Sequence, residues 1–440
     1  MLVYCLLFTM QVVTIASMRP LSALRRLSPQ SSALLIFIII FLLAVNYLRS
    51  VPAPDPSSIF FDPAQAYEKR YSLHRIVEAE KFISEAQTER QGRASTDPTF
   101  CVGIATVQRD GARYFGTLMG SLLSGLCGLE RSDMILMPFI ANVDPQTHQA
   151  YHEPWLHNVA DHVLTYENVP TEEKERLRSM QTPSGHKEKA LFDYSYVLRA
   201  CLDSNAPYIL MLEDDVLAAD GWFRRTKAAL RSLEDEKVFD HSIYLRLFYN
   251  TRLHGWNSEF WPHYLFWSLI FELSMLGGLY LLCSSTSISL FFTPRTKFVT
   301  LCICTPACVA LYFAAGRLTV QPFPLGVHRM DNFGCCSQAF VFPREQVPSL
   351  LDYLKKERTG LRDVLIERYA DLNGLARWAQ TPSVFQHIGS RSTKWRGPGS
   401  DVVDANGKLS TDRIWNYRFE SWNADELQRE REAGSGGCEP

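Results

Sequence analysis

The stretch "APYILMLEDDVLAADGWF" (Ala206 to Phe223) decides the fold, because an apolar run leads directly into three consecutive acids. The run from Tyr208 to Leu212 is short and continuous, which predicts a buried strand. Ligands of open α/β sheets bind outside the carboxyl ends of the strands, where Glu213, Asp214 and Asp215 are expected. Adjacent like charges repel one another, so a bound cation would explain this acidic group. The alternative is the start of a helix, where acids favour the positive end of the dipole.

The composition of the chain is that of a globular protein with several long apolar runs. Its 440 residues, 46% of them hydrophobic, are enough for one large core or two ordinary ones. A formal net charge of -2 argues against a polyanionic partner such as nucleic acid. The apolar runs indicate a membrane protein.

The first clear membrane signal is the uncharged run "SSALLIFIIIFLLAVNYL" at residues 31–48. Its length is about that needed to cross a bilayer, so it is predicted to be a transmembrane anchor. Arginines before the run stay in the cytosol under the positive-inside rule, which makes the chain after Leu48 luminal. These arginines are Arg19, Arg25 and Arg26.

Segments outside the anchor and the central part of the chain carry weaker signals. Residues 1–30 are a cytosolic tail or an apolar start, and the sequence leaves open whether the chain begins at Met1 or Met18. Residues 49–99 are interpreted as a stem, and residues 426–440 are predicted to be a disordered tail.

Two further apolar runs lie far downstream, at Trp261 to Cys283 and Phe298 to Gly316. Arg295 and Lys297 lie between them and suit a cytosolic turn, so the pair is predicted to be a transmembrane hairpin that returns the chain to the lumen. Buried core helices are the alternative. Glu272 interrupts the first run, and an acid within a span usually faces protein or a polar cavity.

The luminal part alternates between strand-like and helical patterns. Strands are predicted at Phe100 to Arg109, Asp133 to Asp144 and Ala160 to Asn168, with helices at Arg113 to Leu126 and His186 to Ser204. This order indicates right-handed βαβ units and a doubly wound, mainly parallel α/β sheet.

The same sheet is expected to continue on both sides of the hairpin. A strand is predicted at His241 to Asn250, and a further strand, helices and a terminal strand follow after the hairpin. We therefore divide the luminal part into residues 100–260 and 317–425, with the hairpin at residues 261–316 inserted between them.

The chain has 11 cysteines, five of which lie in the apolar runs. The other six permit up to three disulfides in an oxidising lumen, and their pairing cannot be read from the sequence. None of the six has the spacing of a zinc site. The six are Cys101, Cys127, Cys201, Cys335, Cys336 and Cys438.

Five short motifs, in the order "TVQR", "KALFDY", "YILMLEDDV", "RDVLIERYA" and "PSVFQHIG", give the chain a family resemblance. Phe100 to about Trp395, less the hairpin, resembles GT-A glycosyltransferases and, more narrowly, the N-acetylglucosaminyltransferase IV group. The hairpin within the domain is similar to that of the post-GPI-attachment N-acetylgalactosamine transferases. The resemblance implies a GT-A fold and a Golgi enzyme that moves N-acetylgalactosamine from UDP-GalNAc to the mannose core of GPI-anchored proteins, with inversion.

Two other functions remain open at this point. The first is an N-acetylglucosaminyltransferase that acts on N-glycans, because the donors are C4 epimers and the sequence does not show the pocket contacts that separate them. The second is a non-enzymatic membrane scaffold or transporter, which would explain several spans and a polar Glu272. It would leave the acids at the strand end unexplained.

The resemblance also implies a metal site and a donor site. Asp215 and His387 would hold Mn²⁺ or Mg²⁺, for which carboxylate and imidazole are acceptable ligands. Glu213 and Asp214 would face the uridine and ribose of the donor. A single histidine after a strand is otherwise more often structural, and Gln338 would either line the acceptor pocket or fill a strand position.

Further donor contacts are implied for Thr106 and Arg109 in "TVQR" and for Lys189 and Asp193 in "KALFDY". An arginine after a strand is common without a function. Lys187 is an alternative to Lys189. An amphipathic helix would also explain Lys189 and Asp193 without any role in donor binding.

Inversion requires a base that deprotonates the acceptor hydroxyl. Asp363 in "RDVLIERYA" matches the acid that precedes the corresponding helix in the relatives. Glu367, one turn later, is the rival base, and a structural acid at a helix start is the alternative to both.

Overall fold

The computed structural model describes residues 29–50, 55–109, 113–182, 185–284, 293–330, 335–389 and 414–434. These residues form two compact units. The membrane unit comprises the described residues within 1–66 and 254–322, and the sheet unit comprises those within 67–253 and 323–440. We describe each unit by itself.

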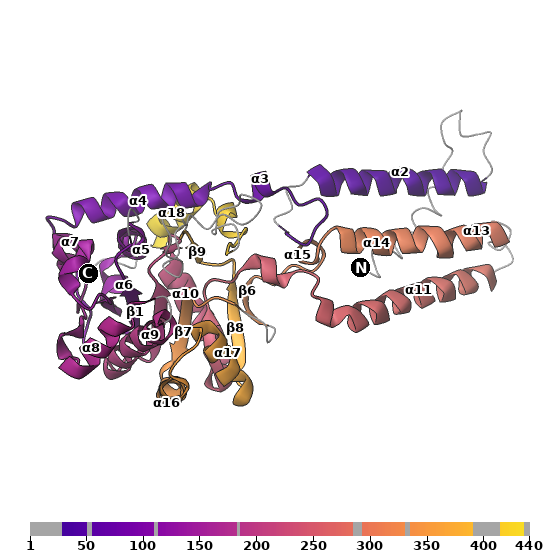
Figure 1. Cartoon of the computed structure of the whole chain (residues 1–440). Helices are drawn as coiled ribbons and strands as arrows, with labels where there is room; N and C mark the ends of the chain where they lie inside the picture. The colour runs from indigo at the N-terminus through magenta and orange to yellow at the C-terminus, as the bar shows by residue number, and fades with distance from the viewer. Residues whose placement is uncertain are drawn as a thin grey trace. The chain divides into compact units, whose positions relative to one another are not determined.

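The sheet unit is built on seven strands in the order β2-β1-β3-β7-β5-β8-β6. Of these, β1, β7 and β8 follow one another from left to right in Figure 1. Strands β2, β1, β3, β5 and β8 run in one direction, whereas β7 and β6 run in the other, so the sheet is mixed but mostly parallel. The strands are β1 (Phe100–Thr106), β2 (Met134–Ile140), β3 (Tyr208–Glu213), β5 (Ser242–Arg246), β6 (Gly326–Arg329), β7 (Ala339–Pro343) and β8 (Ala376–Thr381).

Both faces of the sheet are covered by helices, which explains why its strands are apolar without alternation. One core cluster joins α5 (Tyr114–Leu123) and α10 (Trp222–Asp235) to Leu210 and Leu212 of β3. The opposite cluster joins Ile209 and Met211 to α9 (His186–Asp203), α16 (Val347–Glu357) and α17 (Arg362–Leu372). The predicted α/β architecture with a mostly parallel sheet is therefore confirmed.

Strands from both sides of residues 261–316 share this sheet, because β7 lies between β3 and β5. The predicted strand at residues 160–168 is wrong: Leu164 forms only an isolated bridge with Phe139, and a 3-10 turn follows at Tyr166–Asn168. The strand predicted at residues 241–250 ends at Arg246.

Shorter elements surround the sheet, and a two-stranded sheet pairs β4 (Val216–Ala218) with β9 (Phe385–His387). Residues Ala424–Gly434 form a helix, in which Leu427 is buried and Arg431 pairs with Asp220 at 3.0 Å. The prediction of a disordered tail at residues 426–440 is therefore wrong up to Gly434, and residues 435–440 lie outside the described residues. The remaining helices of the sheet unit are α4 (Tyr71–Glu85), α6 (Gly128–Ser132), α7 (Pro154–Val159), α8 (Thr171–Ser179) and α18 (Ala424–Gly434).

Two disulfides join described cysteines of the sheet unit. Cys101 of β1 is bonded to Cys201 of α9, and both are fully buried. Cys335 is bonded to its neighbour Cys336, just before β7.

Among the described residues, three helices are long and apolar enough to cross a bilayer, at Gln30–Ser50, Thr251–Ser284 and Pro294–Ala314, and all of them except Thr251–Leu253 belong to the membrane unit. They correspond to the three predicted spans and fit a membrane protein. The helices of this unit are α2 (Pro29–Ser50), α3 (Pro63–Ala66), α11 (Trp261–Ser284), α13 (Pro294–Val299), α14 (Thr305–Ala314) and α15 (Arg317–Val320).

The third span contains a wider turn directly before its proline. A π-helical turn at Thr300–Cys304 joins α13 to α14, and Thr305 Oγ1 donates to the carbonyl of Thr300 at 2.8 Å. Pro306 has no N–H, and such local adjustments satisfy the backbone around a proline within a membrane. The span therefore continues through Pro306.

Candidate active site

The backbone around the three acids contacts a segment that follows the inserted hairpin in the sequence. Asp214 and Asp215 form the turn between β3 and β4, and β4 pairs with β9 so that Val216 lies opposite His387. The N–H of Ile388 donates to the carbonyl of Asp215 at 2.9 Å. Consequently His387 Nε2 lies 3.5 Å from Asp215 Oδ2, although the two residues are 172 positions apart in the sequence.

Gly389 is required beside this pair. A Cβ at position 389 would lie 2.4 Å from Asp215 Oδ2, well inside van der Waals contact. The glycine of "FQHIG" therefore allows the backbone to approach the carboxylate closely.

Arg109 supplies the positive charge of the site. Its Nη1 lies 2.9 Å from Asp215 Oδ2, and its Nη2 forms a hydrogen bond and ion pair with Asp214 Oδ1. Thr106 Oγ1 donates to Asp214 Oδ2 at 2.8 Å. These contacts arise because β1 and β3 are parallel neighbours, with Ala105 opposite Glu213, so both strands end at one edge of the sheet.

The two aspartates differ electrostatically. Burial raises the pKa of Asp214 to about 6, even though Arg109 opposes the shift. Burial also disfavours the charge on Asp215, but His387 and Arg109 outweigh it and hold the pKa of Asp215 well below its usual range. Asp215 is thus the permanent anion of the site.

A histidine that sequence reasoning missed extends this cluster. The N–H of Ala150 donates to His148 Nδ1 at 3.2 Å, so the ring proton lies on Nε2, which donates to Thr106 Oγ1 at 3.2 Å. Burial lowers the pKa of His148 to about 4, which keeps the ring neutral. His148 follows β2 at the same sheet edge, and that position was its only sequence signal.

A pocket adjoins the cluster and has both polar and aromatic walls. Thr106, Arg109 and Asp214 contribute polar groups, while Phe115 and Trp155 contribute aromatic rings. Pockets with apolar walls and a few convergent polar groups are the usual form of small-molecule sites.

The described residues contain no group of three or more His, Cys, Asp or Glu side chains arranged to hold a metal. Asp215 and His387 nevertheless suit a divalent cation. Asp215 Oδ1 and His387 Nδ1 are buried and have no hydrogen-bond partner in the part of the chain that the structure describes. Oxygen and imidazole ligands are those that Mn²⁺ accepts.

Lys189 and Asp193 lie one helical turn apart on α9 and bind each other. Lys189 Nζ donates to Asp193 Oδ2 at 2.8 Å, to Tyr166 Oη at 2.8 Å and to the carbonyl of Ala141 at 2.7 Å. All three ammonium protons are therefore used within the protein, and burial raises the pKa of Asp193. Their donor-binding role stays a prediction.

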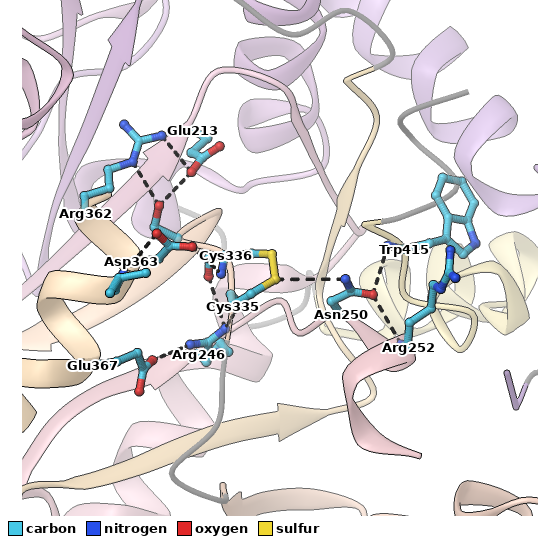
Figure 2. Close-up of a disulfide and its surroundings, with 12 residues drawn as sticks. Glu213, Arg246, Asn250, Arg252, Cys335, Cys336, Arg362, Asp363, Glu367 and Trp415 are labelled. Atoms are coloured by element: carbon cyan, nitrogen blue, oxygen red, sulfur yellow. Dashed lines mark hydrogen bonds and ion pairs between the residues drawn. A yellow bond between two sulfur atoms is a disulfide. The ribbon is translucent and has the colours of Figure 1, made fainter. Parts of the chain in front are cut away.

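Glu213 faces a different set of residues from Asp214. Arg362 Nη2 lies 2.7 Å from Glu213 Oε1 (Figure 2). Ser337 Oγ donates to the same oxygen at 2.7 Å. Arg362 Nε donates to Ser337 Oγ at 2.9 Å and closes the triangle. The structure therefore connects Glu213 to the start of α17, where Asp363 lies.

Asp363 and its rival Glu367 have different environments on α17. Asp363 is half-buried, and its Oδ2 accepts a hydrogen bond from the N–H of Cys336 at 3.0 Å. Glu367 is buried and accepts from Tyr244, Arg246 and Arg377, with Arg246 Nη2 at 2.8 Å. Those three donors occupy the Glu367 carboxylate, whereas Asp363 retains access to solvent.

Comparison with known proteins gives the class of enzyme. The sequence profile described as GPI-N-acetylgalactosamine transferase PGAP4 matches residues 100–386, which is most of the sheet unit together with residues 261–316. The family consists of glycosyltransferases, so the chain is an enzyme of that class. The chain belongs to the GPI-N-acetylgalactosamine transferase family. No curated protein matches the chain.

Proposed function

We propose that the chain transfers N-acetylgalactosamine from UDP-GalNAc to a mannose of the GPI-anchor core, with inversion, on the luminal side of the Golgi membrane. The observation that carries the proposal is the cluster of Thr106, Arg109, Asp214, Asp215 and His387 at one sheet edge, beside a partly aromatic pocket. Such an arrangement at strand ends of a GT-A-type sheet suits a nucleotide sugar.

The pocket suits the nucleoside of the donor. Tyr114, which is half-buried, offers an aromatic ring to a planar base in front of the buried Phe115 and Trp155, and Arg109 offers a guanidinium to the diphosphate. The hydrogen bond from Thr106 to Asp214 fixes one carboxylate oxygen, so the cluster is organised before the donor binds.

Asp215 and His387 would hold Mn²⁺ or Mg²⁺. When bound, such an ion supplies positive charge that stabilises the departing diphosphate. Asp215 suits this task because Arg109 and His387 keep it ionised. Arg109 lies against the same carboxylate and would orient the phosphates alongside the ion.

Asp363 would act as the base. Its half-buried carboxylate is held by a backbone N–H on Oδ2, which leaves lone pairs to accept the proton of an acceptor hydroxyl. Glu367 is unsuited to this role because Tyr244, Arg246 and Arg377 occupy it.

The test is transfer by the purified full-length protein in detergent. UDP-GalNAc, UDP-GlcNAc and UDP-galactose would each be supplied with a mannose-containing GPI glycan, with and without EDTA and added Mn²⁺. We expect product with UDP-GalNAc only, and its loss in EDTA. Product with UDP-GlcNAc alone would indicate the N-acetylglucosaminyltransferase alternative, and product that is unaffected by EDTA would refute the metal.

A further inference from the structure

The disulfide between Cys335 and Cys336 lies between the candidate base and a buried arginine. Figure 2 shows Asp363 on one side of the disulfide and Arg246 below it. The N–H of Cys336 donates to Asp363 Oδ2 at 3.0 Å. Arg246 Nη1 donates to the carbonyls of Cys335 and Cys336, the latter at 3.1 Å.

Cys336 has a backbone conformation that needs support. Its φ is +83°, in the left-handed region that L-residues other than glycine rarely adopt. Residues held in such conformations persist only where their surroundings determine them, and they are concentrated at functional sites. Here the covalent ring with Cys335 and the bonds from Arg246 provide that support.

Arg246 is itself held firmly in place by its neighbours. It is 1% exposed and lies on β5, where Glu367 Oε1 binds its Nη2 at 2.8 Å. Its guanidinium also lies 4.8 Å from the centre of the Phe340 ring. The carbonyls of both cysteines are thus fixed to the sheet, and the direction of the Cys336 N–H is fixed with them.

We propose that the Cys335–Cys336 disulfide is a positioning element for the Asp363 carboxylate, and that full turnover requires the disulfide to be intact. The proposal rests on the proposed function of Asp363 as base. Neither cysteine contacts substrate in this scheme. Without the disulfide, the backbone of Cys336 would relax to negative φ and its N–H would turn away from Asp363 Oδ2. The Asp363 carboxylate would then lose the hydrogen bond that fixes its orientation.

Two paired variants of the full-length enzyme test the proposal. Cys335→Ala/Cys336→Ala removes the disulfide and leaves an L-residue at the positive-φ position, whereas Cys335→Ala/Cys336→Gly removes it but places glycine there. Glycine adopts positive φ without a steric penalty. We expect kcat to fall about ten- to hundredfold in the Ala/Ala variant, as for a displaced catalytic group, with the KM for UDP-GalNAc unchanged. The Ala/Gly variant should recover a measurable part of kcat.

Reduction of the wild-type enzyme provides a matched measurement. A phosphine such as TCEP supplies two electrons and takes oxygen from water, converting the disulfide to two thiols. We expect the kcat of the wild-type enzyme to fall to that of the Ala/Ala variant. The same treatment of the Ala/Ala variant measures what the other disulfides contribute: the Cys101–Cys201 bond is fully buried, whereas Cys127 is disulfide-bonded and half-buried. A loss in the wild type no larger than the loss in the Ala/Ala variant would contradict the proposal.

The outcomes separate this inference from the proposed function. Wild-type kcat in the Ala/Ala variant overturns the inference, as does an Ala/Gly variant that recovers nothing while both variants melt at the same reduced temperature. If Asp363→Asn is fully active, the base assignment fails and the inference fails with it. If the wild-type enzyme transfers no sugar from any UDP donor, the proposed function itself is wrong.

Discussion

Asp215 is the residue at which the charges of the site converge, since Arg109 and His387 both contact its Oδ2. We predict that Asp215→Asn lowers transfer by about three orders of magnitude, the equivalent of several kcal/mol of lost charge stabilisation. Isothermal titration with Mn²⁺ should show weaker binding as well. The matched control is Asp214→Asn, which should weaken Mn²⁺ less because Asp214 is bound by Thr106 and Arg109. Unchanged Mn²⁺ affinity in Asp215→Asn would remove this residue from the metal site.

Asp363 is the residue on which deprotonation of the acceptor depends in our scheme. We predict that Asp363→Asn lowers kcat by about two to four orders of magnitude, the range for a lost general base. UDP-GalNAc binding, measured by titration, should be preserved because Asp363 contacts Cys336 and Val364 rather than Asp214 or Asp215. Normal turnover in this variant would assign the proton transfer to another group.

His148 makes the stability of the sheet unit depend on pH. Its pKa is about 4 in the folded protein against an ordinary value of 6.5, so the unfolded chain binds a proton in this window that the folded chain does not. Stability is therefore complete above pH 6.5 and declines as the pH falls towards 4, by at most about 2 kcal/mol down to about pH 5. We predict a smaller fall in melting temperature over this range for His148→Gln than for wild type. Equal falls would show that other groups cause the acid sensitivity.

At the scale of single elements, the strands that the sequence predicts are those with continuous apolar runs. The run at Tyr208 to Leu212 is β3 because helices cover both faces of the sheet. The segment at residues 160–168, which mixes apolar and polar residues, was also predicted to be a strand, but it lies beside β2 through one bridge only. Local pattern does not distinguish these cases, because strand pairing depends on distant parts of the chain.

The candidate site shows the same division between local and distant information. The acids after β3 were recognisable from their position, whereas the ion pair with Arg109 required the parallel register of β1 and β3. His148 lies between two short 3-10 turns, in a segment without a periodic pattern, so no local rule identified it. The bond between Cys335 and Cys336 was one of several pairings that the sequence allowed.

Helix α17 is attached to the sheet through one buried acid, which provides a test at the scale of an element. Glu367 accepts from Arg246 on β5 and Arg377 on β8, which are 1% and 3% exposed. We predict that Glu367→Gln destabilises the protein by about 3–5 kcal/mol, because the two buried guanidinium groups lose the buried negative charge that they share. The measurement is the urea or thermal unfolding midpoint in detergent.

The control lies on the same helix. Asp371 also pairs with Arg377, at 2.7 Å, but its side chain is 53% exposed. Asp371→Asn should therefore change stability by no more than about 1 kcal/mol, as exposed ion pairs do. Similar losses in both variants would contradict the view that burial decides the strength of this network.

At the scale of the whole molecule, a contact within the membrane unit relates the anchor to the third span. Asp55 Oδ2 accepts from the N–H of Thr319 at 2.9 Å, and Ser58 Oγ donates to the carbonyl of Ala314 at 3.2 Å. Asp55 follows the end of α2 by only five positions, which an extended chain spans in less than about 18 Å, well short of a bilayer. With both helices crossing a bilayer, this contact would require the end of the anchor and the end of the third candidate span to lie on the same side of it.

This topology agrees with the arrangement of the sheet, whose strands precede and follow the two inserted spans. An even number of crossings between Asp215 and His387 allows both to reach one site, as their 3.5 Å separation requires. A catalytic chain attached to the membrane both by the anchor at residues 31–48 and by the hairpin at residues 261–316 would be restricted in its distance from the bilayer surface. A freely diffusing acceptor does not need this restriction, whereas an acceptor attached to lipid benefits from it.

We predict that the hairpin raises the effective concentration of membrane-held GPI acceptor at the site. Replacing Trp261 to Gly316 by a flexible linker, while the anchor at residues 31–48 keeps the protein in the membrane, should lower transfer to GPI proteins in vesicles by about tenfold or more. Transfer to a soluble mannose acceptor should persist, because the sheet unit contains the whole candidate site. A control linker of twice the length distinguishes the loss of membrane attachment from strain at the junction, since only strain is relieved by extra length. Equal retention of both activities would contradict the prediction and leave the hairpin with a role in location alone, while equal loss of both, with a lowered melting temperature, would assign it to folding.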